Sequence, residues 1–255
     1  MVRPNFVTSE VQLQPIAVPP GTVQVACWNI LYDDAGEYAN IGSQVERLPN
    51  IAQTLDTILP DASVIGICEV EGDNGKMLAA QTNLPDSQWT PHDRENEHIG
   101  FLGKKLGEPE FIPLGGESTA CITTVDEITV VMLHLTYKIM GSRLRTKQLH
   151  TLDERLADEK YVIKMGDFNT MPWQQPRRDM HHYGFQSVFR QLGIEYFPTV
   201  PIPRYKPHLR FRDRLASVVG FAVDDIYTKG LIAESAGVFE GDSDHVGLWT
   251  NLRKQ

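Results

Sequence analysis

The stretch Tyr161-Val162-Ile163-Lys164-Met165-Gly166-Asp167-Phe168-Asn169 joins an apolar run to a short polar motif. The run has the composition of a strand, and the Gly-Asp-Phe-Asn sequence predicts a tight turn at its end. Residues two apart in extended backbone point the same way, so we expect Asp167 and Asn169 to reach one spot. A carboxylate there can orient or deprotonate a water, and a carboxamide can donate to a developing oxyanion. An ordinary surface turn, built from the same residue types, is the alternative.

The composition is that of a globular chain that needs no disulfide framework. Of the 255 residues, 41% are hydrophobic and 22% are charged, which allows a large core and one domain over residues 1–255. Cys27, Cys68 and Cys121 lie in apolar runs without CxxC spacing. They predict buried thiols in a reducing compartment rather than disulfides or a zinc site.

The N-terminal residues 1–20 predict an extension that contains prolines and lacks the apolar segment of a signal peptide. No window approaches 18 uninterrupted apolar residues, so we expect no contact with a membrane and a cytoplasmic location. We also expect a monomer that needs no obligate protein partner. The net charge of −9 argues against general coating of nucleic acid, although a local basic groove is compatible with it.

Short apolar runs alternate with helical patterns along the chain, which predicts an α/β protein with mixed or stacked sheets and helices outside. Asp126 and Glu127 separate two of the runs and predict a hairpin with a two-residue turn. Helices are expected at about Pro49–Leu59, after Asp73 as the N-cap, and at about Ser142–Glu159. The predicted strands are Val23–Trp28, Val64–Cys68, Ile99–Leu102, Ala120–Val125, Ile128–Leu135, Tyr161–Met165, Phe221–Tyr227 and Val246–Leu252.

Several polar residues stand at the ends of these strands. Asn29 ends the first run and could hold a metal-bound water, although asparagine also terminates strands as a turn residue. Glu69 closes the run Val64–Cys68, where it is either solvated or a ligand; one such carboxylate suffices to anchor Mg²⁺. His134 lies near the end of another run, where a buried structural histidine is the alternative.

Two carboxylates, Asp224 and Asp225, fall within a predicted strand, which is costly unless each is paired. The natural partner is a histidine, because an aspartate fixes its tautomer and keeps it cationic. His245 precedes the last predicted strand, and Asp244 beside it could bind a metal water. A salt bridge to an arginine is the alternative for the aspartate pair.

Taken in order, these residues resemble the endonuclease/exonuclease/phosphatase superfamily, the DNase I-like metal-dependent phosphoesterases. The resemblance implies a four-layer α/β sandwich, with two mixed sheets packed face to face and helices outside. The stretches that carry it are Trp28-Asn29-Ile30, Val64–Val70, His134-Leu135, Arg145 with Gln148, Gly166–Asn169 with Pro172, Val223–Ile226 and Ser243–His245.

The resemblance also implies a metal site. Glu69 is expected to bind Mg²⁺ or Mn²⁺ directly, while Asn29 and Asp244 support the metal-bound waters. Cys68, directly before Glu69, stands where relatives often have glutamine. The resemblance therefore does not imply which residue supports the metal ligand at this position.

The roles implied for the remaining residues belong to the reaction. Asp167 is expected to activate the attacking water, and Asn169 to steady that water or the phosphorus. His245, held by Asp224, and His134 are expected to contact the phosphate. Relatives commonly have an aromatic residue after the aspartate, whereas this chain has Asp225, which competes with Asp224 as the partner of His245.

A proline-rich loop follows Pro198, and from Pro201 to Arg214 it is basic. Its Arg210 and Arg212 are candidate contacts to a phosphate backbone. Trp173 could stack on a base or pack in the core, and Arg145 is a further substrate contact unless it belongs to a solvated face.

These expectations converge on a metal-dependent hydrolase of phosphodiester bonds. A nuclease acting on DNA or RNA is the leading hypothesis, because the basic loop accompanies the full set of catalytic residue types. A phosphoesterase acting on a phospholipid headgroup or a small phosphoester is the alternative. A third hypothesis is a binding module without catalysis, although every catalytic position carries a suitable side chain.

Overall fold

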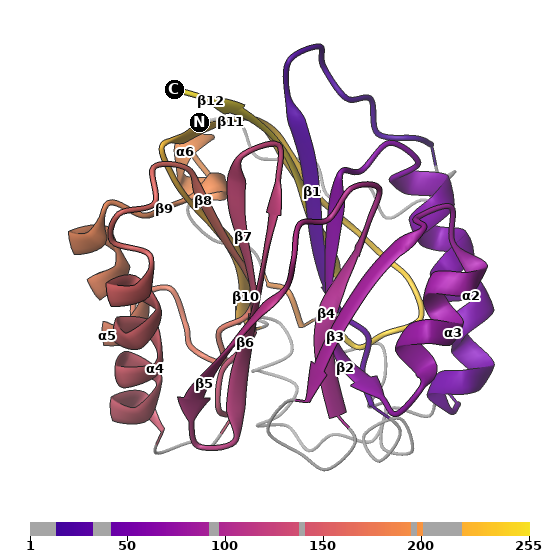
Figure 1. Cartoon of the computed structure of the whole chain (residues 1–255), viewed down its shortest axis with the longest axis horizontal. Helices are drawn as coiled ribbons and strands as arrows, with labels where there is room; N and C mark the ends of the chain where they lie inside the picture. Colours follow the sequence, from indigo (N-terminus) through magenta and orange to yellow (C-terminus); the bar gives the residue numbers. More distant parts are fainter. Residues whose placement is uncertain (1–13, 33–41, 92–96, 138–140, 195–197, 201–220) are drawn as a thin grey trace, which may run out of the picture.

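The computed structural model describes residues 14–32, 42–91, 97–137, 141–194, 198–200 and 221–255. Two sheets pack face to face, and helices cover the outer face of each (Figure 1). The first sheet has the order β11-β12-β1-β2-β4-β3, and the second has the order β5-β6-β7-β8-β10-β9. Both are mixed, because β1–β2 and β7–β8 are parallel pairs among antiparallel ones. The predicted four-layer α/β sandwich is confirmed.

The strands of the first sheet are β1 (Val23–Asn29), β2 (Val64–Glu71), β3 (Asp86–Pro91), β4 (Glu97–Gly103), β11 (Leu231–Phe239) and β12 (Gly247–Lys254). Those of the second are β5 (Glu110–Gly115), β6 (Ser118–Val125), β7 (Ile128–His134), β8 (Val162–Asp167), β9 (Gln186–Ser187) and β10 (Asp224–Lys229). The helices are α2 (Gln44–Ile58), α3 (Asn74–Gln81), α4 (Ser142–Arg155), α5 (Gln175–Asp179), the 3₁₀ helix η1 (Met180–Tyr183) and α6 (Val188–Gln191).

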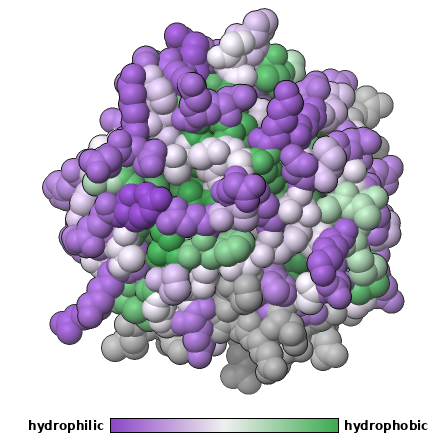
Figure 2. Space-filling model, in the orientation of Figure 1, coloured by the Kyte–Doolittle hydropathy of each residue, from purple (hydrophilic) through white to green (hydrophobic). Residues whose placement is uncertain are grey.

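Three apolar layers fill the space between these elements. Inner-face residues such as Phe101 and Met165 pack between the sheets. Trp28 and Leu55 belong to the layer under α2, and Leu152 to the layer under α4. On the face seen in Figure 2, polar side chains dominate the outer surface and apolar side chains show between them. Because successive side chains of a strand point to opposite faces, each sheet contributes buried apolar residues both to the layer between the sheets and to the layer under its helices.

The hairpin prediction is confirmed in detail. Asp126 and Glu127 join β6 to β7, with φ angles of 49° and 63°. Two successive positive φ values define the turn whose twist matches that of the flanking strands. The three cysteines are free and buried, as predicted. No helix in the described ranges is long and apolar enough to span a membrane.

Helix boundaries differ from the sequence-based expectations. The helix predicted to begin at Pro49 begins at Gln44, because Ser43 and Glu46 form a capping box that the prediction missed. Pro49 therefore lies inside α2 rather than in its first turn. The helix after Asp73 is confirmed, but the Asp73 carboxylate binds Lys76 instead of capping the backbone. The strands β3, β5, β9 and β11 were not predicted, since their sequences are short, polar or interrupted by glycine and proline.

Candidate active site

The polar residues predicted at strand ends meet at one edge of the two sheets. Because β7 and β8 are parallel and β10 runs antiparallel to β8, His134, Asp167 and Asp224 occupy neighbouring register positions. In the facing sheet, Asn29 of β1 is the register partner of Cys68, next to Glu69. The fold thus brings together five candidate residues that are far apart in sequence.

Glu69 occupies a β-bulge. Its φ angle is 60°, and the β2–β4 register shifts between Ile67 and Val70. The Gln44 side chain holds this backbone, since its Nε2 donates to the Glu69 carbonyl oxygen at 2.7 Å. An irregular strand end of this kind re-aims a side chain, and here it directs the carboxylate toward the space between the sheets.

The Glu69 carboxylate is buried, and hydrogen bonds to both of its oxygens fix its orientation. Asn29 Nδ2 donates to its Oε1 at 2.7 Å, and the Tyr32 backbone N–H donates to its Oε2 at 3.3 Å. Burial raises the pKa of Glu69 to about 7, and Glu97 adds to the rise, while His134 opposes it. A bound cation would stabilise the ionised form at this position.

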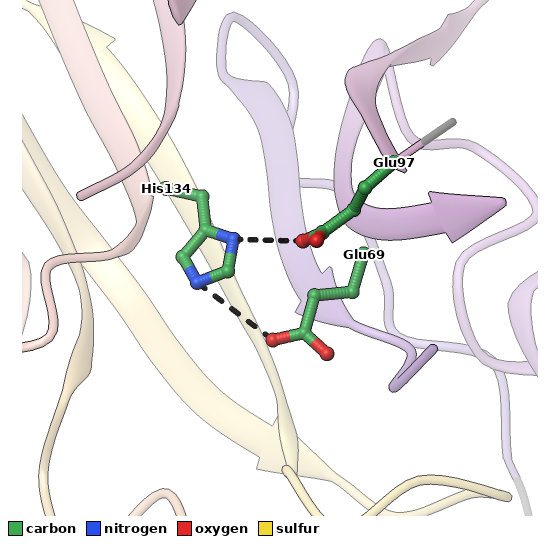
Figure 3. A group of neighbouring side chains, drawn as sticks. All are labelled: Glu69, Glu97 and His134. Atoms are coloured by element: carbon green, nitrogen blue, oxygen red, sulfur yellow. Dashed lines mark ion pairs between the residues drawn. The ribbon is translucent and has the colours of Figure 1, made fainter. Parts of the chain in front are cut away.

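Glu97 is a site residue that the sequence reasoning missed. Its Oε1 lies 3.4 Å from Nδ1 of His134, whose Nε2 lies 3.7 Å from Glu69 Oε1 (Figure 3). Nε2 of His134 also lies 3.7 Å from Asp167 Oδ2. In the sequence, Glu97 follows a charged run and resembles a loop residue. The period-two pattern of the strand could have identified it, because Glu97 lies on the same strand face as the buried Ile99 and Phe101.

A second carboxylate–histidine pair, Asp224 with His245, belongs to the same site. Nδ1 of His245 is 2.7 Å from Asp224 Oδ2. Burial disfavours the imidazolium, but the charges of Asp224 and Asp244 outweigh it and raise the pKa of His245 well above its ordinary value. The His245 backbone is fixed as well, since its carbonyl accepts from Trp28 Nε1 at 3.0 Å.

The structure distinguishes the two adjacent aspartates. Asp224 faces the space between the sheets and contacts His245. Asp225 faces the opposite side of β10 and pairs with the buried Arg177. The alternative of a salt bridge to arginine therefore holds for Asp225, and histidine pairing holds for Asp224.

Asp167 and Asn169 line the same cavity, but strand alternation is the wrong explanation for it. The strand ends at Asp167, and Asn169 lies beyond it with a φ angle of 46°. The Asn169 backbone N–H donates to Asp167 Oδ1 at 2.6 Å, and its Nδ2 donates to the Leu135 carbonyl at 2.8 Å. Gly166 makes this turn possible, because its φ is 128° and a Cβ there would overlap the Leu133 carbonyl oxygen. The surface-turn alternative is excluded, since Asp167 is buried.

A cavity of about 370 Å³ opens over these groups. Its polar part includes Asp244, whose buried Oδ1 accepts no hydrogen bond from the described residues and lies 3.9 Å from His245 Nε2. Its other lining residues are Leu31, Tyr32, Tyr137, Val200, Phe221 and Val223. The cavity therefore combines a floor of carboxylates and imidazoles with apolar and aromatic walls.

The donor set suits a hard divalent cation. The side chains of Glu69, Glu97 and His134 each bring a possible ligand atom within 4.8 Å of the others, and Asp167, Asp224 and His245 form a second such group. Asp167 adds to this concentration of negative charge, and burial together with Asp224 raises its pKa. Carboxylate oxygens and imidazole nitrogens are common ligands of divalent cations, and the orphan oxygen of Asp244 offers a further acceptor for a metal-bound water.

The residues predicted to contact the substrate differ in their burial, where the structure describes them. Arg145 is buried, and its Nη1 donates to the Thr136 carbonyl at 2.9 Å, so the alternative of a solvated face is wrong. Burial lowers the pKa of Arg145, while the charge of Asp167 opposes the change. Trp173 is 57% exposed, which excludes the core alternative. Arg210 and Arg212 lie outside the described residues.

Neither the protein-family models nor the curated proteins contain a match to this sequence. Solved structures do match in fold. An endonuclease/exonuclease/phosphatase family protein from Bacteroides thetaiotaomicron has a TM-score of 0.68 at 14% identity, covering 92% of this chain and 96% of its own. D. rerio TDP2 complexed with single strand DNA product has a TM-score of 0.69 at 15% identity, covering 91% and 99%.

The mannosyl-6-phosphatase Bt3783 of Bacteroides thetaiotaomicron VPI-5482 has a TM-score of 0.68 at 15% identity, covering 90% of this chain and 99% of its own. All three alignments span both sheets, since they cover at least nine-tenths of this chain. The chain has the endonuclease/exonuclease/phosphatase fold, the four-layer arrangement of DNase I-like proteins.

Proposed function

We propose that this chain is a Mg²⁺- or Mn²⁺-dependent phosphodiesterase, and specifically a nuclease acting on DNA or RNA. One observation carries the proposal. Two buried carboxylate–histidine pairs, Glu97–His134 and Asp224–His245, flank the Asp167 carboxylate at one cavity. A phosphodiester is an anion, and this set can bind it with the His245 imidazolium and the His134 ring while a carboxylate acts on water.

His245 is suited to contact a non-bridging phosphate oxygen. Asp224 occupies its Nδ1 side, so Nε2 is the atom directed to the substrate, and the raised pKa keeps the ring cationic at neutral pH. His134 also lines the cavity and offers a second contact. Each histidine depends on a carboxylate for its orientation.

Asp167 is suited to orient the attacking water and accept its proton. Its Oδ1 is engaged by the Asn169 N–H, whereas its Oδ2 faces Asn29 Nδ2 at 3.5 Å and the cavity. Asn169 also lines the cavity and can donate its second amide hydrogen to the phosphate. The turn after β8 thereby places a base and an amide donor side by side.

Glu69 would hold the metal, Asn29 would fix the orientation of Glu69, and Asp244 would hold a metal-bound water. When bound, the metal supplies positive charge to the phosphate and to the leaving oxygen, which replaces a strong general acid. The raised pKa of Glu69 reflects the burial that a cation would offset.

The TDP2 structure with single strand DNA product supports a nucleic-acid substrate, and the aromatic walls at Tyr137 and Phe221 offer surfaces for stacking. A phosphoesterase acting on a small phosphoester is a second candidate. It is supported by the mannosyl-6-phosphatase of the same fold and by the cavity volume of about 370 Å³, which is in the range of small-molecule sites.

Hydrolysis of bis-p-nitrophenyl phosphate and of p-nitrophenyl phosphate, with Mg²⁺, Mn²⁺ or EDTA, tests the reaction class. We expect metal-dependent hydrolysis that favours the diester, and cleavage of labelled single-stranded DNA, duplex DNA or RNA in the same buffers. Preference for the monoester would overturn the nuclease proposal in favour of the second candidate. Inactivity toward every phosphoester would overturn both.

A further inference from the structure

We propose that Arg177 and Asp225 form a brace that positions the Asp167–Asn169 turn against Asp224. The inference rests on the proposed function for the roles of those three residues. Neither Arg177 nor Asp225 lines the main cavity, so both act through other groups. They are positioning residues rather than catalytic ones.

The Arg177 guanidinium is buried and reaches four acceptors. Its Nη1 donates to the Thr170 carbonyl at 3.1 Å and to the Ala222 carbonyl at 2.7 Å. Its Nε donates to the Tyr227 hydroxyl at 3.0 Å, and its Nη2 contacts Asp225 Oδ2. A planar fork with five N–H donors can satisfy this set at fixed angles, whereas an ammonium group cannot.

The two carbonyl groups belong to the two catalytic segments. Thr170 directly follows Asn169, and Ala222 lies two residues before Asp224. One nitrogen atom, Nη1, therefore ties the turn after β8 to the entry of β10. The guanidinium also lies 5.5 Å from the ring centroid of Phe168, the residue between the proposed base and the amide.

Asp225 fixes the guanidinium from the outer face of β10. Its Oδ1 accepts from Ser187 Oγ at 2.9 Å and from the Ile226 backbone N–H at 2.8 Å, while Oδ2 faces Arg177. Strand alternation places Asp224 on one face and Asp225 on the other. The position of the guanidinium is thus coupled through one peptide unit to the carboxylate that holds His245.

Stability alone is a weak explanation for a buried ion pair. Apolar residues of similar volume often stabilise a fold as well as such a pair does. Arg177 instead fixes the relative position of two segments, because its Nη1 donates to the Thr170 carbonyl and to the Ala222 carbonyl. A displacement of about 1 Å at reacting groups can reduce the rate by about 100-fold.

The test compares Arg177→Lys and Asp225→Asn with Arg178→Lys. Arg178 is the matched control, because it is the next residue of α5, is exposed, and donates to Gln175 at 2.7 Å. We expect the first two variants to lower kcat per folded molecule about 10- to 100-fold, with KM changed less than about twofold. Arg178→Lys should leave both constants unchanged.

A second readout does not depend on activity. The Nδ1–H proton of His245, hydrogen-bonded to Asp224, should give a downfield NMR signal in the wild-type protein. We expect this signal to shift or broaden in Arg177→Lys and Asp225→Asn and to stay in place in Arg178→Lys. Circular dichroism gives the folded fraction for each variant.

The outcomes separate the two proposals. Unchanged kcat per folded molecule together with an unchanged His245 signal, in both variants, would overturn the brace. If Arg177→Lys does not fold, Asp225→Asn decides alone. If the wild-type protein hydrolyses no phosphoester, the proposed function fails, and the His245 signal still decides whether the brace positions Asp224.

Discussion

Asp167 and Asp224 lie directly opposite each other in the antiparallel β8–β10 pair, and both are buried. Two carboxylates in this arrangement repel, and burial together with the charge of Asp224 raises the pKa of Asp167. Histidines offset the charge on each side, with His245 at 2.7 Å from Asp224 and His134 at 3.7 Å from Asp167. The strand register therefore concentrates negative charge where a cation and an anionic substrate can meet.

Replacing the proposed base tests the reaction most directly. We expect Asp167→Asn to lower kcat about 100-fold or more, because the amide cannot accept the proton of the attacking water. Hydrolysis of bis-p-nitrophenyl phosphate in Mg²⁺ measures the effect. The exposed Asp158→Asn is the control and should retain full activity. Equal activity in the two variants would contradict the role of Asp167.

Replacing Asp224 should change the charge of His245. The wild-type pKa of His245 is raised well above 6.5 by Asp224 and Asp244 against the effect of burial. In Asp224→Asn the main raising charge is gone while burial remains, so the pKa of His245 should fall. We expect the imidazolium, and with it kcat/KM, to be lost at lower pH than in the wild-type protein.

An NMR titration of the imidazole nitrogens checks this directly. When folding raises the pKa of a group, that group stabilises the folded state fully at pH values below its pKa in the unfolded chain. The stabilisation is lost as the pH rises toward and through the pKa of the group in the folded protein. The stabilising effect of the Asp224–His245 pair should therefore be largest below about pH 6.5 and decline above it. An unchanged His245 titration in Asp224→Asn would contradict the assigned pairing.

Replacing the proposed metal ligand should separate metal binding from folding. Burial makes the ionised Glu69 costly, so Glu69→Gln should melt at the same temperature as the metal-free wild-type protein, or higher. The rise in melting temperature on adding Mg²⁺ should disappear in the variant, because binding to the native state is lost.

Calorimetric titration with Mg²⁺ gives the affinity of each protein. Glu71→Gln is the control, since Glu71 ends the same strand but is absent from the cavity lining. We expect it to keep the Mg²⁺-dependent rise. A full Mg²⁺ response in Glu69→Gln would assign the metal to other ligands.

A buried lysine predicts how stability depends on pH. Lys164 interrupts the apolar face of β8, pairs with Asp153 and lies 3.8 Å from the Phe185 ring centroid. Burial lowers the pKa of Lys164 to about 8 from 10.5, although Asp153 opposes the change. Between these values the unfolded chain binds more protons, so the free energy of unfolding should rise with pH, by at most about 1.4 kcal/mol per pH unit for one proton.

The matched control is the double variant Lys164→Met with Asp153→Leu, which replaces the ion pair with apolar residues and removes this titration. Urea unfolding at several values between pH 8 and pH 10.5 gives the comparison. The wild-type curve should gain stability relative to the variant as pH rises. A constant difference between the two curves would contradict a lowered pKa in the folded state.

The amino-acid pattern predicted the parts of the fold that local chemistry specifies. The Asp126-Glu127 hairpin followed from two apolar runs separated by two residues, because a two-residue turn fixes its own geometry. The start of α2 was predicted wrongly, because Pro49 was assigned to the first helical turn. The capping box of Ser43 and Glu46, which marks the true start, is visible in the sequence. β11 was missed because its alternation is weak and its exposed face mixes polar and apolar residues.

The residue types that stand at or near the strand ends could be identified from the sequence alone, because apolar runs mark the strands. They are Asn29, Glu69, His134, Asp167 and His245. Tertiary structure alone decided the pairings. Asp224 rather than Asp225 meets His245 because alternate residues of β10 face opposite sides of the sheet. Glu97 joins His134 because the two sheets pack face to face, which places residues 37 positions apart at 3.4 Å. No local pattern encodes that distance, because it depends on how two separate sheets stack.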